Sequence, residues 1–119
     1  PTLPLSSALA NINLDMIGRN APTTIEVIHR TDSDLGELTQ SVAALHDDIG
    51  VSPVDRPDNL LVQRSDCWAF LSRGVDALFL HSGLHDDYHG LDDEVDRLDS
   101  EKAAAVGRLA WWVGLELVR

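Results

Sequence analysis

The chain has 119 residues, of which 44% are hydrophobic, enough for one modest core and not for two. Its 9 basic and 20 acidic residues give a formal net charge of −11, which argues against a nucleic-acid or anionic-membrane partner, because both favour clustered lysine and arginine. No apolar run is long enough to span a membrane. The chain begins with Pro1 and shows no leader sequence, so we expect a single domain, or a part of one, from a longer protein.

Two strands are predicted near the start of the chain. From Ala10 to Met16, apolar and polar residues alternate, which is typical of a strand with one buried face, and Asp15 points away from the apolar set. Residues 18–22 form a turn, and residues 24–28 are rich in β-branched side chains, which predicts a second strand. We expect the two strands to pair as a hairpin.

A helix is predicted over residues 34–49, because Asp34 and Glu37 have the spacing of a capping box and apolar residues recur at helical spacing up to Gly50. His46 and the two acids after it are interpreted as solvent-facing. Residues 52–59 contain two prolines and are expected to be a loop, and residues 60–62 are expected to form a short strand.

The second half of the chain alternates helix and strand. A short helix is predicted over residues 66–73, a buried central strand over residues 75–81, and a long amphipathic helix over residues 100–119, with Lys102 and Arg108 away from its apolar face. This order favours a layered α/β fold. The single cysteine, Cys67, cannot form an internal disulfide and is interpreted as a small packed residue.

An acidic, histidine-ended loop, residues 82–89, follows the predicted central strand. Open α/β sheets bind ligands beyond the carboxyl ends of their strands. Carboxylate oxygen and neutral imidazole nitrogen are both zinc ligands, so Asp15 and His89 are candidate metal ligands. Two ligands do not complete a site, and on spacing alone a structural role for each residue is the commoner outcome.

Several motifs together resemble the two-zinc aminopeptidases of metallopeptidase family twenty-eight, of the bacterial leucyl aminopeptidase type. The motifs are residues 13–19 (Asn-Leu-Asp-Met-Ile-Gly-Arg), residues 64–66 with Phe70, residues 74–77, and residues 83–89 followed by Asp93. They occur in the family's order over nearly the whole chain. The resemblance implies part of a three-layer α/β/α zinc-peptidase (phosphorylase/hydrolase-like) fold with a mixed sheet, so residues 1–119 would be the C-terminal portion of one catalytic domain.

The resemblance also implies roles for individual residues. Asp15 would be a ligand of one zinc ion and His89 a ligand of the other, and Tyr88 would donate a hydrogen bond to the oxyanion that forms during hydrolysis. A Tyr that packs on the loop surface remains an equal alternative for Tyr88. Asp66, His85 and Asp93 would lie in the pocket or behind the ligands, and Asp93 could either orient His89 or cap the following turn.

The implied reaction is hydrolysis of a peptide or aminoacyl substrate by a metal-bound water with a Glu as the general base. The family takes that Glu, a bridging Asp and further ligands from upstream motifs that this chain lacks, so we expect the fragment alone to hold zinc incompletely and to be inactive. Two positions depart from the family pattern. Cys67 replaces a common His, and Gly90-Leu91 replace Thr-Pro after the ligand His.

Two other functions stay open. The parent could be a binding module with an inactive metal site, or a glutaminyl-cyclase-like acyltransferase that uses similar ligands. A homodimer is expected if the fragment exposes core surface that the rest of the parent would cover. Export to the periplasm or medium is favoured by the resemblance alone.

Overall fold

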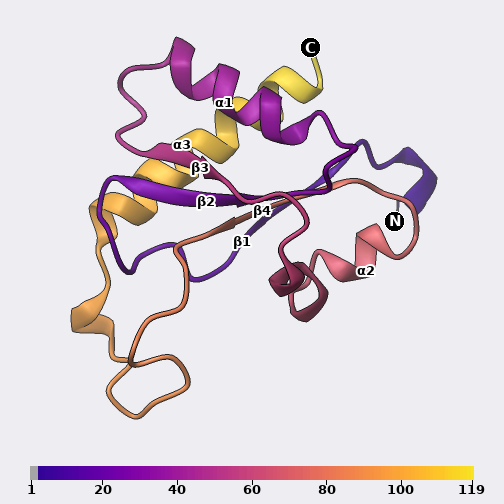
Figure 1. Ribbon diagram of the computed structural model, residues 1–119. Coiled ribbons are helices and arrows are strands. Elements are labelled where there is room, and N and C mark those ends of the chain that lie inside the picture. The colour runs from indigo at the N-terminus through magenta and orange to yellow at the C-terminus, as the bar shows by residue number, and fades with distance from the viewer. Residues whose placement is uncertain (1–2) are drawn as a thin grey trace.

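A four-stranded mixed sheet forms the centre of the computed structural model, which describes residues 3–119 (Figure 1). Its strands are β1 (Asn11–Leu14), β2 (Thr24–Ile28), β3 (Ser52–Asp55) and β4 (Ala77–His81), in the order β1-β4-β2-β3. β1 runs parallel to β4, β3 runs parallel to β2, and β2 is antiparallel to β4. The sheet therefore has two pairs of parallel strands that run in opposite directions.

Helices cover both faces of this sheet. The long helices α1 (Leu35–Leu45) and α3 (Ser100–Leu117) lie on one face, and the short α2 (Trp68–Leu71) lies on the other with a 3₁₀ helix, η2 (Leu60–Arg64) (Figure 1). Two further 3₁₀ helices are η1 (Leu5–Ser7) and η3 (Val95–Arg97). No helix within residues 3–119 is long and apolar enough to cross a membrane. The predicted α/β class and the layered arrangement are confirmed.

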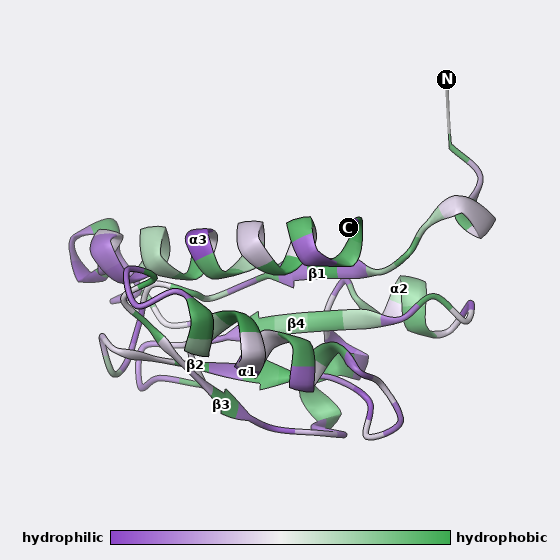
Figure 2. Ribbon diagram, turned by 90° about the horizontal axis from the view of Figure 1, so that it is seen from above, coloured by the Kyte–Doolittle hydropathy of each residue, from purple (hydrophilic) through white to green (hydrophobic). Residues whose placement is uncertain are grey.

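Strand β4 is the centre of the core, as predicted, and all five of its residues are buried. Its side chains alternate between two clusters, because successive residues of a strand point to opposite faces. Leu78 and Leu80 pack under α1 and α3, whereas Ala77 and Phe79 pack with Cys67 on the side of α2 and η2. Figure 2 shows β4 as a continuous hydrophobic strand between more polar neighbours.

The predicted hairpin between the first two strands is wrong. Both strands exist, but β4 lies between them and pairs with each: Asn13 is opposite Phe79, and Ile28 is opposite the same Phe79 from the other side. The physical reason is burial, because the most apolar segment of the chain gains most from the position that is covered on both faces and both edges.

Two assignments in the middle of the chain are also wrong. The first half of the expected loop 52–59 is strand β3, which accommodates Pro53 because it is an edge strand, where a missing N–H leaves no ladder bond unmade. The expected strand 60–62 belongs to η2 instead. Asn59 caps this turn, since its side-chain oxygen accepts a hydrogen bond from the Leu61 N–H at 3.0 Å.

The helices begin and end differently from the prediction. Asp34 makes no capping hydrogen bond; instead the Leu35 N–H donates to the Ser33 hydroxyl at 3.1 Å, and Ser33 is held by the Asp76 carboxylate at 2.5 Å. Helix α1 ends at Leu45 rather than at residue 49, and α2 covers only four of the eight predicted residues. Helix α3 is confirmed to residue 117 and is capped by Asp99.

Lys102 was expected on the outer side of α3, but it is buried. Its Nζ donates a hydrogen bond to the Arg19 carbonyl oxygen at 2.5 Å. Burial lowers the pKa of this ammonium group, with Asp99 opposing the shift. Lys102 thus ties the start of α3 to the turn that follows β1.

Candidate functional site

The candidate site lies at the edge of the sheet where β1 and β4 both end. The two strands are parallel, so their carboxyl ends meet at the same edge. Asp15 follows β1 directly and its N–H donates to the Leu80 carbonyl at 3.3 Å, and the Ser82 N–H donates to the Met16 carbonyl at 3.2 Å. Asp15 is therefore adjacent to the start of the loop that carries Tyr88 and His89.

A small pocket at this edge is lined by two of the predicted residues. Asp15 and Tyr88 both line it, and the Tyr88 ring stacks on the His89 ring, with 3.9 Å between centroids and 22° between planes. Both Asp15 and His89 are exposed. The other lining residues are Met16, Leu61, Arg64, Ser65, Phe79, His81 and Leu84.

One candidate ligand, His89, and the residue after the other both have a left-handed backbone conformation. His89 has a φ of 57°, and Met16, the residue after Asp15, has a φ of 55°. Residues other than glycine rarely adopt this left-handed region, and they do so mainly where the surrounding structure imposes it, often at functional sites. The local backbone is consistent with a site that holds its side chains in fixed positions.

Hydrogen bonds and ion pairs hold the loop of residues 82–89 against the turn after β1. The Asn20 side-chain amide donates to the carbonyl oxygens of Ser82, Gly83 and Leu84 at 2.9, 3.2 and 3.0 Å. The Arg19 guanidinium pairs with the carboxylates of Asp87 and Asp93. Its hydrogen bond, together with the charge of Arg97, holds the pKa of Asp87 below its ordinary value.

Three further predicted residues lie outside the small pocket. The Asp93 carboxylate pairs with Arg19 at 2.5 Å rather than with His89. The side chain of His85 is only 5% exposed, its Nε2 is 4.0 Å from the Asp93 carboxylate, and its Nδ1 has no hydrogen-bond partner within residues 3–119. Both residues line a second, more apolar pocket beside the start of α3. Asp66 is exposed and lines neither pocket.

His81 is a site residue that sequence reasoning left without a role. It ends β4, is buried, and lines the small pocket with Asp15 and Tyr88. The Gly83 N–H donates to its Nδ1 at 2.9 Å, so the ring proton of the neutral form lies on Nε2. Burial lowers the pKa of His81, against the opposing charges of Glu26 and Asp15, which favours that neutral form. The sequence feature that could have identified His81 is its position as the last residue of a buried strand, where α/β sheets bind their ligands.

The donor types at this edge fit zinc, but their number does not complete a site. Asp15 supplies a carboxylate oxygen and His89 an imidazole nitrogen, which are ordinary zinc ligands. No group of three or more His, Cys, Asp or Glu side chains within residues 3–119 is arranged to hold a metal ion. A zinc ion bound here would need further ligands from outside these residues.

Comparisons with known proteins agree with this reading of the fold. Residues 2–113 match the sequence model of peptidase family M28. The LapA aminopeptidase of Legionella pneumophila is similar in structure, with a TM-score of 0.73 and 23% identity over 92% of this chain and 30% of that chain. An aminopeptidase from Aneurinibacillus sp. strain AM-1 has a TM-score of 0.71 and 18% identity over 95% of this chain and 26% of that chain. A search of curated proteins finds no match. The chain spans less than a third of the length of the two solved aminopeptidases.

Proposed function

The chain belongs to peptidase family M28, and we propose that it is the C-terminal part of a zinc-dependent, aminopeptidase-like hydrolase. One observation carries this proposal: Asp15, after β1, and Tyr88, after β4, line one small pocket at the shared carboxyl edge of two parallel strands, and the His89 ring stacks on Tyr88. The two solved structures of similar fold are both aminopeptidases. The substrate would be a peptide or another aminoacyl compound.

Each residue at this edge has a proposed role. Asp15 and His89 would each hold one of two zinc ions, and bound zinc lowers the pKa of water and polarises the scissile carbonyl. The Tyr88 hydroxyl would donate a hydrogen bond to the oxygen that becomes negatively charged, and the stacking on His89 fixes the direction of the Tyr88 ring. The general base and the remaining ligands would come from other parts of the parent protein.

Chelation tests the metal requirement directly. The full-length protein is expected to contain zinc, to hydrolyse an aminoacyl arylamide, to lose that activity after dialysis against a chelator and to regain it with added zinc. Metal analysis and a colorimetric assay measure both quantities. The 119-residue chain alone serves as the control and is expected to be inactive, because it offers one ligand to each ion. A full-length protein without zinc would contradict the proposal and favour a binding module.

The substrate panel separates the two enzymatic alternatives. A glutaminyl-cyclase-like acyltransferase would cyclise the N-terminal glutamine to a lactam with release of ammonia and without consuming water, whereas an aminopeptidase would use water to release the free amino acid. Mass spectrometry of a peptide with N-terminal glutamine distinguishes the two products. Preferential formation of the cyclised product would replace the aminopeptidase proposal with the cyclase alternative.

Tyr88→Phe tests the proposed hydrogen bond. The variant is expected to lower kcat about 100-fold with little change in KM, because the lost donor acts on charge that develops only in the transition state. Phe keeps the aromatic ring that stacks on His89, so the zinc content should stay equal to that of the wild type. An unchanged kcat would show that Tyr88 is only a packing residue of the loop surface.

A further inference from the structure

Arg19 connects the two segments that carry the candidate ligands. It lies four residues after Asp15, in the turn that follows β1, and its guanidinium pairs with Asp87 through Nη2 and with Asp93 through Nη1. These two carboxylates lie on either side of His89, two residues before it and four residues after it. One side chain therefore holds both flanks of the loop that presents His89.

The position of Arg19 is itself fixed by the start of α3. Its carbonyl oxygen accepts a hydrogen bond from the buried Lys102 Nζ, and the carbonyl of the preceding Gly18 accepts one from the Asp99 N–H at 2.8 Å. The Arg19 side chain is only 11% exposed and the Asp87 side chain only 16%. Ion pairs with so little solvent contact hold their geometry better than pairs on the surface.

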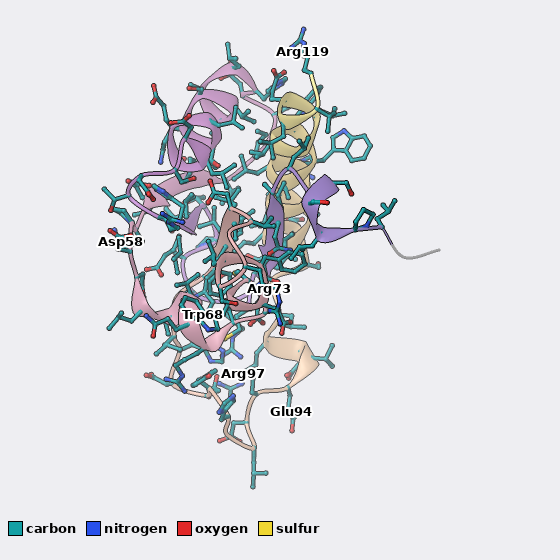
Figure 3. All side chains as sticks on the ribbon, turned by 90° about the vertical axis from the view of Figure 1, so that its right-hand side faces the viewer. Asp58, Trp68, Arg73, Glu94, Arg97 and Arg119 are labelled. Carbon is teal, nitrogen blue, oxygen red and sulfur yellow. The ribbon has the colours of Figure 1, made fainter. Side chains whose placement is uncertain are left out.

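A second arginine makes a weaker contact with the same loop. Arg97 Nη1 lies 3.1 Å from the Asp87 carboxylate, and the Arg97 side chain is 52% exposed. Figure 3 shows Arg97 beside Glu94 at the end of the molecule opposite Arg119. Arg97 reaches one carboxylate from the solvent side, whereas Arg19 reaches two from the side of the sheet. The two arginines thus form a matched pair for experiment.

We propose that Arg19 is a positioning residue that sets the separation between Asp15 and His89, and hence the geometry in which the parent protein binds zinc. This inference rests on the proposed function. Arg19 acts through Asp87 and Asp93, which it holds in the fork of one planar guanidinium. A lysine would keep the charge but offers a single point donor, so it could not hold both carboxylates in the same arrangement.

The first test needs no metal. In zinc-free full-length protein, Arg19→Gln and Arg19→Lys are expected to speed the amide hydrogen exchange of residues 84–93 at least tenfold, because the loop loses its attachment to the sheet. Arg97→Gln should speed the same exchange about threefold or less. Arg30→Gln, which removes an exposed pair with Asp32 elsewhere on the chain, should leave the loop unchanged.

The second test measures zinc affinity by competition with a chelator. Groups that orient metal ligands typically contribute 10-fold to 100-fold to affinity, so Arg19→Gln and Arg19→Lys are both expected to weaken zinc binding by at least tenfold. If Arg19 acts through its two partners, then Arg19→Gln should add little to a variant that already carries Asp87→Asn and Asp93→Asn. If Arg19→Gln instead weakened zinc binding through a general loss of structure, its effect would add in full to the effect of the two asparagine substitutions.

The outcomes separate the two proposals. Wild-type exchange rates and zinc affinity in Arg19→Gln would overturn the positioning role, as would full additivity with the two asparagine substitutions. Arg19→Lys matching the wild type would show that charge alone is sufficient and would overturn the geometric part. If the wild-type full-length protein binds no zinc, the proposed function fails, and the exchange experiment still reports whether Arg19 orders the loop.

Discussion

Asp15→Asn and His89→Ala are each expected to weaken zinc binding in the full-length protein by more than about 100-fold and to abolish its peptidase activity. Residues that only orient a ligand contribute up to about 100-fold to affinity, and a ligand itself should contribute more. Asn keeps the shape of Asp15 and removes its charge, so the change tests the carboxylate rather than the packing. Zinc affinity is measured by chelator competition, and activity with an aminoacyl arylamide.

Matched controls exist in the same chain. Asp48 is exposed and lies beyond the end of α1, and His46 stacks on Trp112 with 3.9 Å between ring centroids. Asp48→Asn and His46→Gln are expected to leave zinc affinity and activity unchanged. The zinc-free Asp15 and His89 variants should also unfold within about 0.5 kcal/mol of the zinc-free wild type, because both side chains are exposed. Wild-type zinc affinity in either variant would remove that residue from the proposed site.

The elements that could be predicted from the sequence are those with a strong local signal. The fully apolar run around Leu78 and Leu80 predicted the buried central strand, and the helical spacing after Ser100 predicted α3. Pairing between strands could not be read from local pattern. The insertion of β4 between β1 and β2 brings together residues more than 50 positions apart, and the burial of β4 on both faces accounts for that order.

For a similar reason, the sequence predicted the main residues of the candidate site but not the contacts that support them. Asp15, Tyr88 and His89 were found through motifs that resemble a family, since spacing alone left a structural role for each as the commoner outcome. Asp15 and Tyr88 line one pocket because the two parallel strands that precede them end at the same edge, and His89 stacks on Tyr88. The supporting contacts were missed, because the Arg19 pair with Asp87 spans 68 residues and the Lys102 bond to Arg19 spans 83. Charged residues in such contacts look like ordinary surface residues in a sequence.

Gly36→Ala is expected to destabilise the protein by about 3 kcal/mol, although alanine is the better helix former. Gly36 lies in the first turn of α1, and a Cβ built there would be 2.2 Å from the Nε2 atom of His29. The His29 ring cannot easily move, because it is buried, its Nε2 is 2.7 Å from the Asp55 carboxylate, and its Nδ1 is 2.7 Å from the Arg30 carbonyl. Overpacking costs about 1–3 kcal/mol and loss of a charge-assisted hydrogen bond about 1.5–3 kcal/mol, against a gain of about 1 kcal/mol in helix propensity.

A matched glycine and a second substitution identify the cause of that loss. Gly107 lies in the middle of α3, and a Cβ there would meet nothing within 4 Å, so Gly107→Ala should raise the free energy of unfolding by up to about 1 kcal/mol. In a His29→Ala background the obstacle is gone, and Gly36→Ala should then become neutral or stabilising. Urea unfolding of Gly36→Ala, Gly107→Ala, His29→Ala and the double variant His29→Ala/Gly36→Ala measures these differences. Equal effects of Gly36→Ala with and without His29 would show that the contact with His29 does not determine the choice of glycine.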